Sequence, residues 1–159
     1  MRSADIDAVL AVQRAAYGDD YQEAAEVLLD KWRAGSAWCH VAELAGQCVG
    51  YVLSHPWRHD RVPPLHRRLE LPAQPDCLFL HDLAVAPSGR GHGLGAALLR
   101  AVYAAAAPSF TQIKLVSLGD ATGFWLRNGF KPVMNPCEAA ELSSYGEGAC
   151  HMSQGLVMA

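Results

Sequence analysis

One short segment of this sequence has the residue types that a charged ligand needs: it is rich in glycine and contains a single arginine. It reads Arg90-Gly91-His92-Gly93-Leu94-Gly95. An apolar run at 77–85 precedes it, and apolar residues at helical spacing follow it from Leu94 to Ala105. A helix N-terminus exposes unpaired N–H groups, and glycines let a phosphate approach the backbone. The strand, turn and helix together predict a cradle for a pyrophosphate group.

The glycine spacing distinguishes this cradle from two other phosphate-binding motifs. Residues 91–95 lack the Gly-x-Gly-x-x-Gly spacing of a dinucleotide site, and no Gly-Lys-Ser/Thr closes the segment as in a P-loop. The segment instead resembles motif A of the GCN5-related N-acetyltransferases, the GNAT family, whose pattern Arg/Gln-x-x-Gly-x-Gly/Ala is matched by residues 90–95. The end of the strand that precedes this motif in the family is also similar to a segment here, Leu83-Ala84-Val85 followed by Pro87.

This resemblance implies a fold, a co-substrate and a reaction. The fold is a GNAT-like three-layer α/β (α+β) fold, in which helices flank a central mixed and mostly antiparallel sheet with a parallel central strand pair. The co-substrate is acetyl-CoA. In this family its pantetheine arm pairs with the central strand, here the backbone of Leu83, Ala84 and Val85, while residues 90–95 hold its pyrophosphate. The reaction is transfer of the acetyl group to a primary amine of a small molecule, a peptide or a protein. Homodimers are common among such domains.

A second segment, at 121–130, resembles motif B of the same family. The usual form is Asn-x-x-Ala-x-x-Phe-Tyr-x-x-x-Gly-Phe, and the matching residues are Ala121, Phe124, Gly129 and Phe130. The resemblance implies that Ala121 and Phe124 contribute to the cofactor site. Trp125 stands where the family often has the tyrosine that protonates the leaving thiolate, and an indole N–H is not acidic enough for that role. A non-catalytic, regulatory acetyl-CoA-binding module of the same fold is therefore the alternative function.

Two titratable residues lie on the predicted central strand just before Leu83. Strand alternation places His81 on one face and Asp82 on the other. GNAT members often carry a glutamate base at the position of His81, and an unperturbed histidine titrates near neutrality, which suits uptake of the amine's proton. His81 is the first candidate for the general base and Asp82 the second. The alternative is structural: a hydrogen-bonded core histidine, and an aspartate bound to neighbouring backbone.

The reaction also requires a proton for the departing thiolate, and Tyr145 is the candidate general acid. It lies in the connection before the last predicted strand, which can return over the active site. Ser117 and His151 are the other candidates. The alternative for Tyr145 is an exposed loop residue with no part in the reaction.

The remaining patterns predict the elements that carry these residues. Helices are expected at 5–17, 21–33, 94–108 and 122–128, and strands at 38–44, 47–55, 77–85, 112–118, 130–134 and 149–157. The strand at 112–118 should run parallel to that at 77–85, since a right-handed crossover joins them. Residues 56–76 contain five prolines and predict a long loop with one helical turn at 65–69. The resemblance places this loop at the acceptor site.

Length, charge and composition limit the classes of function. At 159 residues, of which 51% are hydrophobic, the chain suits one globular domain over 1–159. A net charge of -3 and a pI near 6.1 argue against nucleic acid as the main partner. There is no membrane-spanning run and no signal-peptide pattern, and the five cysteines are widely spaced, so a cytoplasmic location is expected. His55, His59 and His66 do not have the spacing of a metal site, because Pro56 interrupts them, and no metal is expected.

Overall fold

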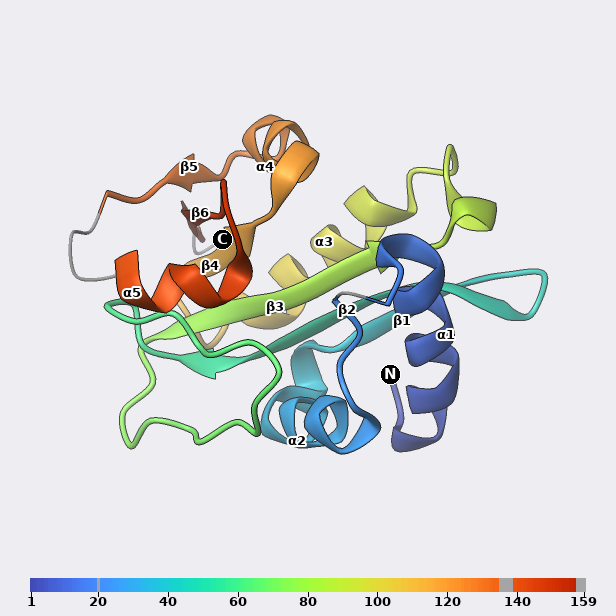
Figure 1. Cartoon of the computed structure of the whole chain (residues 1–159), viewed down its shortest axis with the longest axis horizontal. Coiled ribbons are helices and arrows are strands. Elements are labelled where there is room, and N and C mark those ends of the chain that lie inside the picture. Colours follow the sequence, from blue (N-terminus) through green and yellow to red (C-terminus); the bar gives the residue numbers. More distant parts are fainter. Residues whose placement is uncertain (20, 135–138, 157–159) are drawn as a thin grey trace.

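The computed structural model describes residues 1–19, 21–134 and 139–156, and within them six strands form one sheet (Figure 1). The strands are β1 (His40–Leu44), β2 (Gln47–Trp57), β3 (Cys77–Val85), β4 (Gln112–Ser117), β5 (Lys131–Pro132) and β6 (Cys150–Gly155), in the order β1-β2-β3-β4-β6-β5. Within this sheet β3 and β4 are parallel, and every other neighbouring pair is antiparallel. The predicted mixed, mostly antiparallel sheet with a parallel central pair is confirmed.

Helices cover both faces of the sheet. They are α1 (Ile6–Tyr17), α2 (Ala25–Gly35), α3 (Leu94–Ala106), α4 (Thr122–Arg127) and α5 (Ala139–Leu142). Two neighbouring residues of β2 show which helices lie on which face. Tyr51 packs with Val9 of α1 and Leu28 of α2. Val52 packs with Leu98 of α3. Side chains alternate between the two faces of a strand. Therefore α1 and α2 lie on one face and α3 lies on the other, as the predicted three layers require (Figure 1).

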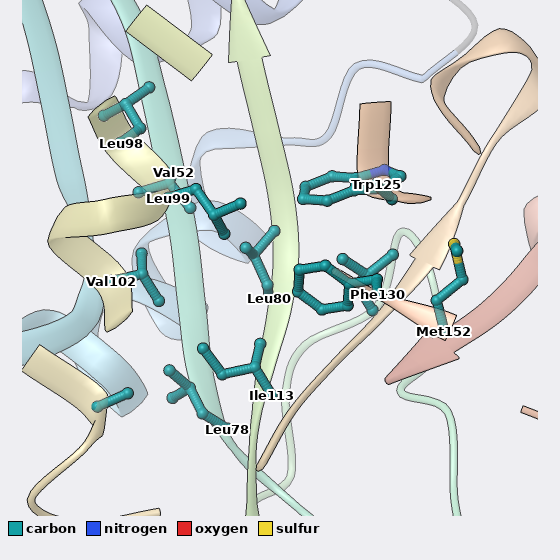
Figure 2. Packing of buried hydrophobic residues seen from close by; sticks show 12 residues of the cluster. Val52, Leu78, Leu80, Leu98, Leu99, Val102, Ile113, Trp125, Phe130 and Met152 are labelled. Atoms are coloured by element: carbon teal, nitrogen blue, oxygen red, sulfur yellow. The ribbon is translucent and has the colours of Figure 1, made fainter. Parts of the chain in front are cut away.

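The larger apolar core lies between the sheet and α3 and continues into the C-terminal half (Figure 2). Leu80 of β3, Ile113 of β4 and Val102 of α3 are buried there, together with Trp125 of α4 and Phe130. The ring of Trp125 meets that of Phe130 edge to face, with centroids 5.4 Å apart. A buried tryptophan removes a large apolar area from water. Trp125 is therefore a core residue as well as the residue at the motif-B tyrosine position.

Several boundaries differ from the predicted ones. α2 begins at Ala25 rather than at 21, so Glu23 lies in the segment before the helix. The predicted connection at 135–148 contains α5 and a 3-10 turn, Ser143–Tyr145. β5 is shorter than the strand predicted at 130–134. Residues 20, 135–138 and 157, on which parts of the predictions fall, lie outside the described residues.

β2 continues to Trp57 through Pro56, although a central strand does not normally contain proline. Beyond Val52 no residue of β1 pairs with β2, so one edge of β2 is free at this point and accommodates a residue without an N–H. The loop that follows β2 therefore starts at residue 58. Within it, residues 65–67 form a turn and not the predicted helical turn.

One irregularity in β3 decides where two candidate catalytic residues point. Leu53 of β2 pairs with Asp82, but the next residue, Ser54, pairs with Leu80, so His81 has no partner and forms a β-bulge. The side chain of His81 contacts α2 and that of Asp82 contacts α1, and both helices lie on the same face. The prediction that the two residues lie on opposite faces was wrong, because simple alternation assumes a ladder without a bulge.

The C-terminal end of α2 lies against β2 at Gly35. A Cβ added to Gly35 would lie 1.9 Å from the carbonyl oxygen of Ser54. The helix that carries Lys31 therefore comes this close to the sheet because residue 35 has no side chain.

We expect Gly35→Ala to lower the free energy of unfolding by roughly 2–3 kcal/mol, because α2 must move away from the sheet. Urea denaturation measures the difference. Gly155→Ala is the matched control, since a Cβ at Gly155 meets no atom within 4 Å. Equal losses in the two variants would contradict the close contact.

His55 of β2 is fully buried on the face of the sheet that α2 covers, beside His81. Its ring stacks on Phe79 with centroids 5.9 Å apart, and its Nδ1 lies 3.1 Å from the carbonyl oxygen of Pro56. Burial lowers the pKa of His55 to about 3, and the neighbouring His81 adds to the effect. In the unfolded chain the pKa of a histidine is about 6.5. The folded protein therefore binds one proton fewer than the unfolded chain between these two pH values.

We expect the stability that the neutral His55 supplies to be complete above about pH 6.5 and to fall as the pH decreases toward about 3. The loss reaches up to about 1.4 kcal/mol per pH unit for one proton. His55→Phe should flatten the plot of melting temperature against pH, whereas His92→Gln, at an exposed histidine, should leave it unchanged. Parallel plots for wild type and His55→Phe would show that His55 is not the source.

Candidate functional site

β3 and β4 separate after a short paired stretch, and a cavity opens where they diverge. The two strands pair at Leu78–Ile113 and at Phe79–Lys114, and nowhere else in the described sheet. The cavity, which we call the split cavity, has a volume of about 110 Å³. Its lining residues are Gln13, Tyr17, Tyr21, Glu23, Leu65, Leu80, His81, Asp82, Leu83, Leu115, Val116, Leu118, Ala121, Trp125 and Tyr145. The two parallel strands thus separate after their paired stretch, and both line the cavity.

The glycine-rich turn leads directly into α3 and leaves its first amides unpaired. Gly93 immediately precedes α3 with a left-handed φ of 68°, and Gly91 has a φ of 80°. A Cβ at either position would meet no protein atom within 4 Å. Among the described residues no side chain caps α3, Arg90 is exposed, and residues 86–95 contain no acidic side chain. The turn therefore presents N–H donors and a cation to solvent, as a phosphate cradle must.

The segment that resembles motif B lies against the cradle. A Cβ on Gly95, in the first turn of α3, would lie 3.4 Å from the ring of Phe124, so the small residue lets α4 approach α3 closely. Phe124 in turn packs on Trp125, with ring centroids 4.9 Å apart. Ala121, Trp125 and Leu83 all line the split cavity. The fold thus brings the predicted cofactor residues of both motifs to one region.

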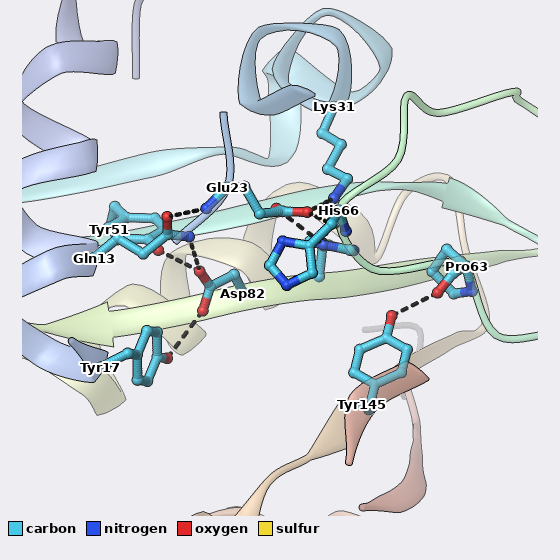
Figure 3. A network of polar contacts seen from close by, with 10 residues as sticks. Gln13, Tyr17, Glu23, Lys31, Tyr51, Pro63, His66, Asp82 and Tyr145 are labelled. Carbon is cyan, nitrogen blue, oxygen red and sulfur yellow. Dashed lines mark hydrogen bonds and ion pairs between the residues drawn. The ribbon is translucent and has the colours of Figure 1, made fainter. Parts of the chain in front are cut away.

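A buried charge cluster lies beside the split cavity (Figure 3). Lys31 of α2 forms an ion pair with Glu23, and its Nζ lies 2.7 Å from Nε2 of His81. The same Nε2 lies 3.4 Å from the second carboxylate oxygen of Glu23. The three side chains are at most 2% exposed. Charges this deeply buried persist only when they are paired.

Lys31, and not His81, carries the proton that balances the charge of Glu23. The ordinary pKa of lysine exceeds that of histidine by about four units. Burial lowers the pKa of His81, and the charge of Lys31 lowers it further. Burial also lowers the pKa of Lys31, but Glu23 opposes this effect. For Glu23 itself, burial opposes ionisation, but the charge and the hydrogen bond of Lys31 act against burial and lower the pKa of Glu23.

This protonation state fixes the tautomer of His81. An ammonium group has no lone pair with which to accept a hydrogen bond. Nε2 of His81 therefore accepts from Lys31, and the neutral ring carries its own proton on Nδ1. That the protein uses His81 as a general base stays a prediction, but the nitrogen beside Lys31 is not free to take up a proton.

Asp82 is held at the surface of the cavity by three donors (Figure 3). Its Oδ2 accepts from Nε2 of Gln13 at 3.0 Å and from the hydroxyl of Tyr51. Its Oδ1 accepts from the hydroxyl of Tyr17 at 2.9 Å. Gln13, Tyr17 and Asp82 all line the cavity, and Asp82 is half-buried. The predicted second candidate for the base is thus a fixed carboxylate at the cavity wall.

Tyr145 also lies in the cavity wall, but its hydroxyl is already bonded. It donates to the carbonyl oxygen of Pro63 at 2.6 Å, and the residue is 3% exposed. Burial raises the pKa of Tyr145, and the charge of Glu23 adds to this. The other acid candidates, Ser117 and His151, are buried and do not line the cavity. The acid role of Tyr145 stays a prediction, and it requires the hydroxyl to leave Pro63.

The bond from Tyr145 is one of several that fasten the loop at 58–76 to the rest of the fold. The N–H of Val62 donates to the carboxylate of Glu141 at 2.8 Å, and the N–H of His66 donates to that of Glu23 at 2.9 Å. Leu65, between these two anchors, lines the split cavity. The loop therefore forms part of the cavity wall.

Sequence analysis did not single out four residues that the fold places at the site. For two of them a signal existed, because Gln13 and Tyr17 are polar residues four apart on the apolar face of α1. For Glu23 and Lys31 no signal existed. They meet because the segment before α2 folds back along the helix, which no local pattern encodes.

Among the described residues, no group of three or more His, Cys, Asp or Glu side chains is placed to hold a metal ion. The same part of the chain contains no helix with the length and apolar character needed to cross a bilayer. Cys39 and Cys77 are buried free thiols, and Cys48 and Cys150 are half-buried free thiols. Cys137 lies outside the described residues.

Solved structures share this fold across their whole length. A GNAT-like decarboxylase, GphF, in complex with isobutyryl-CoA is 21% identical, with a TM-score of 0.80 and 99% of this chain and 97% of that chain covered. The ribosomal-protein-S18-alanine N-acetyltransferase from Escherichia coli is 15% identical, with a TM-score of 0.71 and 100% and 92% covered. A GNAT family acetyltransferase from Brucella melitensis in complex with acetyl-CoA is 22% identical, with a TM-score of 0.59 and 99% and 85% covered. At these identities the likeness concerns the fold.

Among curated proteins no match was found. The family model described as "Acetyltransferase (GNAT) family" matches residues 6–130, which include both motif segments and most of the sheet. The chain therefore belongs to the GNAT acetyltransferase family.

Proposed function

We propose that this protein is an acetyl-CoA-dependent N-acetyltransferase that acetylates a primary amine of a small molecule, a peptide or a protein. The observation that carries the proposal is the convergence of three features. A phosphate cradle lies at the start of α3, the strand that leads into it separates from β4, and a carboxylate lies in the cavity between these strands. Family membership supports the same reaction.

The cradle and the separated strands supply the cofactor site in this proposal. Arg90 and the amides of residues 91–95 hold the pyrophosphate, the backbone of residues 83–85 pairs with the pantetheine arm, and Ala121 and Phe124 border it. The thioester then reaches the split cavity, whose volume of about 110 Å³ is somewhat below that of a cavity of about 150 Å³ that holds a benzene molecule. This volume suits an acetyl group and the reacting end of an amine.

The charges around the cavity favour a cationic acceptor. Two carboxylates, Asp82 and Glu23, line it, and its lining contains no lysine or arginine. Lys31 balances Glu23, so Asp82 leaves a net negative charge at the cavity. A primary amine is an ammonium ion at neutral pH, and its attraction to a carboxylate is stronger in a partly buried site than in water.

The same charges weigh against decarboxylation, the activity named for the GphF structure. A decarboxylase must bind a substrate that carries a carboxylate. Here that carboxylate would lie near Asp82 with no cation in the cavity lining to offset the repulsion. For this reason amines with acetyl-CoA are the first substrates to test. An acyl-CoA with a free carboxyl group comes second.

Amine acetylation needs a neutral nucleophile and a proton for the departing thiolate. We assign proton uptake to Asp82, because it is the carboxylate of the cavity whose charge no buried cation already balances. A thiol has a pKa near 8.5, so the thiolate leaves partly unaided near neutral pH. The reaction therefore does not depend on a proton donor at position 125, where this chain has a tryptophan and the family often has a tyrosine.

The direct test combines the purified protein with acetyl-CoA and a panel of primary amines: an alkylamine, a polyamine, an amino-acid amide and short peptides with free N-termini. Release of free CoA thiol with at least one amine is expected. Tight binding of CoA without thiol release from any amine would support the non-catalytic module instead. Release of CO₂ from malonyl-CoA would support a decarboxylase. Thermal stabilisation by ATP or NAD equal to that by CoA would contradict the cofactor assignment.

The cradle yields a prediction on affinity. Arg90→Ala should weaken CoA binding by about 1.5–3 kcal/mol, because it removes a charge-assisted contact to phosphate. Gly93→Ala should also weaken binding, since its Cβ projects into the space that the ligand would occupy. Calorimetry measures both, and Arg100→Ala, at an exposed arginine farther along α3, is the control. CoA affinity unchanged in both cradle variants would remove the pyrophosphate assignment.

The hydrogen bond between Tyr145 and Pro63 yields a prediction on KM for the amine. We expect Tyr145→Phe to raise KM for the amine about tenfold, because the loop loses one buried hydrogen bond, worth about 1–3 kcal/mol. The increase in KM should be equal for acetyl donors with more and less acidic thiols. A loss in kcat that shrinks as the donor thiol becomes more acidic would instead support the predicted role of Tyr145 as general acid.

A further inference from the structure

Three groups at the split cavity could accept a proton from an amine, and two of them are inaccessible. Nε2 of His81 already accepts from Lys31, and the His81 side chain is 1% exposed. The Glu23 side chain is 2% exposed, and the carboxylate bonds Lys31 and the N–H of His66. Asp82 is half-buried and has no cation within bonding distance among the described residues. It is the remaining acceptor.

Tyr17 lines the cavity beside this carboxylate. Of the three donors to Asp82, Tyr51 is fully buried and does not line the cavity, and Gln13 is 1% exposed. Tyr17 lines the cavity and is 39% exposed. Its hydroxyl lies 2.9 Å from Oδ1 of Asp82 and 2.9 Å from the carbonyl oxygen of Leu83.

The hydroxyl of Tyr17 is placed to pass a proton between two groups. A phenolic hydroxyl has one proton to donate and lone pairs with which to accept. The carbonyl of Leu83 belongs to the strand segment that we assign to the pantetheine arm, so the oxygen of Tyr17 lies next to the proposed path of the thioester. A group that donates to a carboxylate on one side and borders the substrate on the other can pass a proton across.

We propose that Tyr17 is a catalytic residue that relays the proton of the acceptor amine to Asp82. The inference rests on the proposed N-acetyltransferase function, because it needs an amine in the split cavity. Neither motif of the family resemblance contains Tyr17, and Asp82 serves here through Tyr17 and not by direct contact with the amine.

The step balances as follows. The acceptor enters as an ammonium ion and first loses one proton to water. The nitrogen of the neutral amine then forms a bond to the carbonyl carbon of the thioester, and the carbonyl π electrons move to its oxygen. One N–H bond of the resulting ammonium breaks and its proton passes to the oxygen of Tyr17, while the original proton of Tyr17 passes to Oδ1 of Asp82. The oxygen lone pair re-forms the carbonyl as the C–S bond breaks, and the thiolate of CoA leaves. Asp82 then releases the proton to water through Tyr17, the thiolate takes one from water, and the pair returns to its starting state.

The surrounding charges keep Tyr17 in the form that a relay needs. Burial of the hydroxyl raises the pKa of Tyr17, and the charge of Asp82 raises it further, so the phenol stays protonated at neutral pH and does not act as an anion. The other titratable groups on which the charge of Asp82 acts are Lys31 of α2, Tyr51 of β2, Tyr145 and the neighbouring His81 of β3. Lys31 forms a pair with Glu23 that has no net charge.

The test is Tyr17→Phe, which keeps the ring and deletes only the hydroxyl. With acetyl-CoA and the best alkylamine of the panel, kcat should fall about 10²-fold, as for a positioned acid–base group. KM for acetyl-CoA, CoA binding by calorimetry and the melting temperature should stay close to those of the wild type. With methoxyamine, a weakly basic amine, the loss should be clearly smaller, because its protonated adduct gives up the proton to water more readily.

Tyr51→Phe is the matched control, because it deletes a donor to the same carboxylate outside the cavity. Its loss should be smaller than that of Tyr17→Phe and equal for both amines. The double variant Tyr17→Phe/Asp82→Asn should be no slower than the slower single variant, since both residues act in one relay. Full kcat in Tyr17→Phe, equal losses with both amines, or additive losses in the double variant would each overturn the relay while leaving the N-acetyltransferase function intact. A wild type that acetylates no amine would overturn both.

Discussion

The separation of two parallel strands is the constraint around which this molecule is arranged. β3 and β4 share two paired positions and then diverge, so backbone groups on their facing edges lose the partners that a continuous ladder would give them. Buried backbone groups without partners are costly, and they require a side chain, water or ligand as partner. The hydroxyl of Tyr17 lies 2.9 Å from one of them, the carbonyl of Leu83, but donates its single proton to Asp82. The glycine-rich turn follows β3, and α4 contributes Trp125 to the lining of the cavity between the two strands.

A second interaction, the buried ion pair of Lys31 and Glu23, connects several elements beside the split cavity. It joins α2 to the segment before it, reaches β3 through His81, and reaches the long loop through the N–H of His66. Removing one partner from a buried pair typically costs 3–5 kcal/mol, because the other charge is left alone in a region of low dielectric constant. The pair also keeps the ring of His81 neutral. A single buried charge pair thus determines the loop position, the helix position and the protonation state of a neighbouring histidine.

Membership of the family leaves the chemistry open, because structures of this fold include both N-acetyltransferases and a decarboxylase. What distinguishes the two reactions is the charge that the substrate brings into the cavity. Amine acetylation brings a cation, and decarboxylation brings an anion. A cavity lined by Asp82 and Glu23 with only Lys31 behind it suits the cation. The functional assignment therefore depends on the balance of a few charges and not on the shape of the sheet.

Part of this structure can be predicted from a contiguous stretch of the chain. The run from Cys77 to Ala106 contains an apolar strand, two glycines with positive φ and an amphipathic helix, and it specifies the cradle through local backbone preference and helical periodicity alone. The same kind of pattern predicted the order of elements and the parallel central pair. Element boundaries were less secure where Pro56 lay inside a strand and where Glu23 preceded a helix.

Only the tertiary structure decided which side chains act together. The bulge at His81 turns it to the same face as Asp82, and this depends on the register of β3 against β2, which alternation within one strand does not contain. Tyr17 reaches Asp82 across 65 positions of the chain, and Tyr145 reaches Pro63 across 82. Contacts of this kind arise when helices and loops pack on a sheet with a particular offset. A shift of one residue or a few degrees would exchange their partners, so no periodicity in the sequence records them.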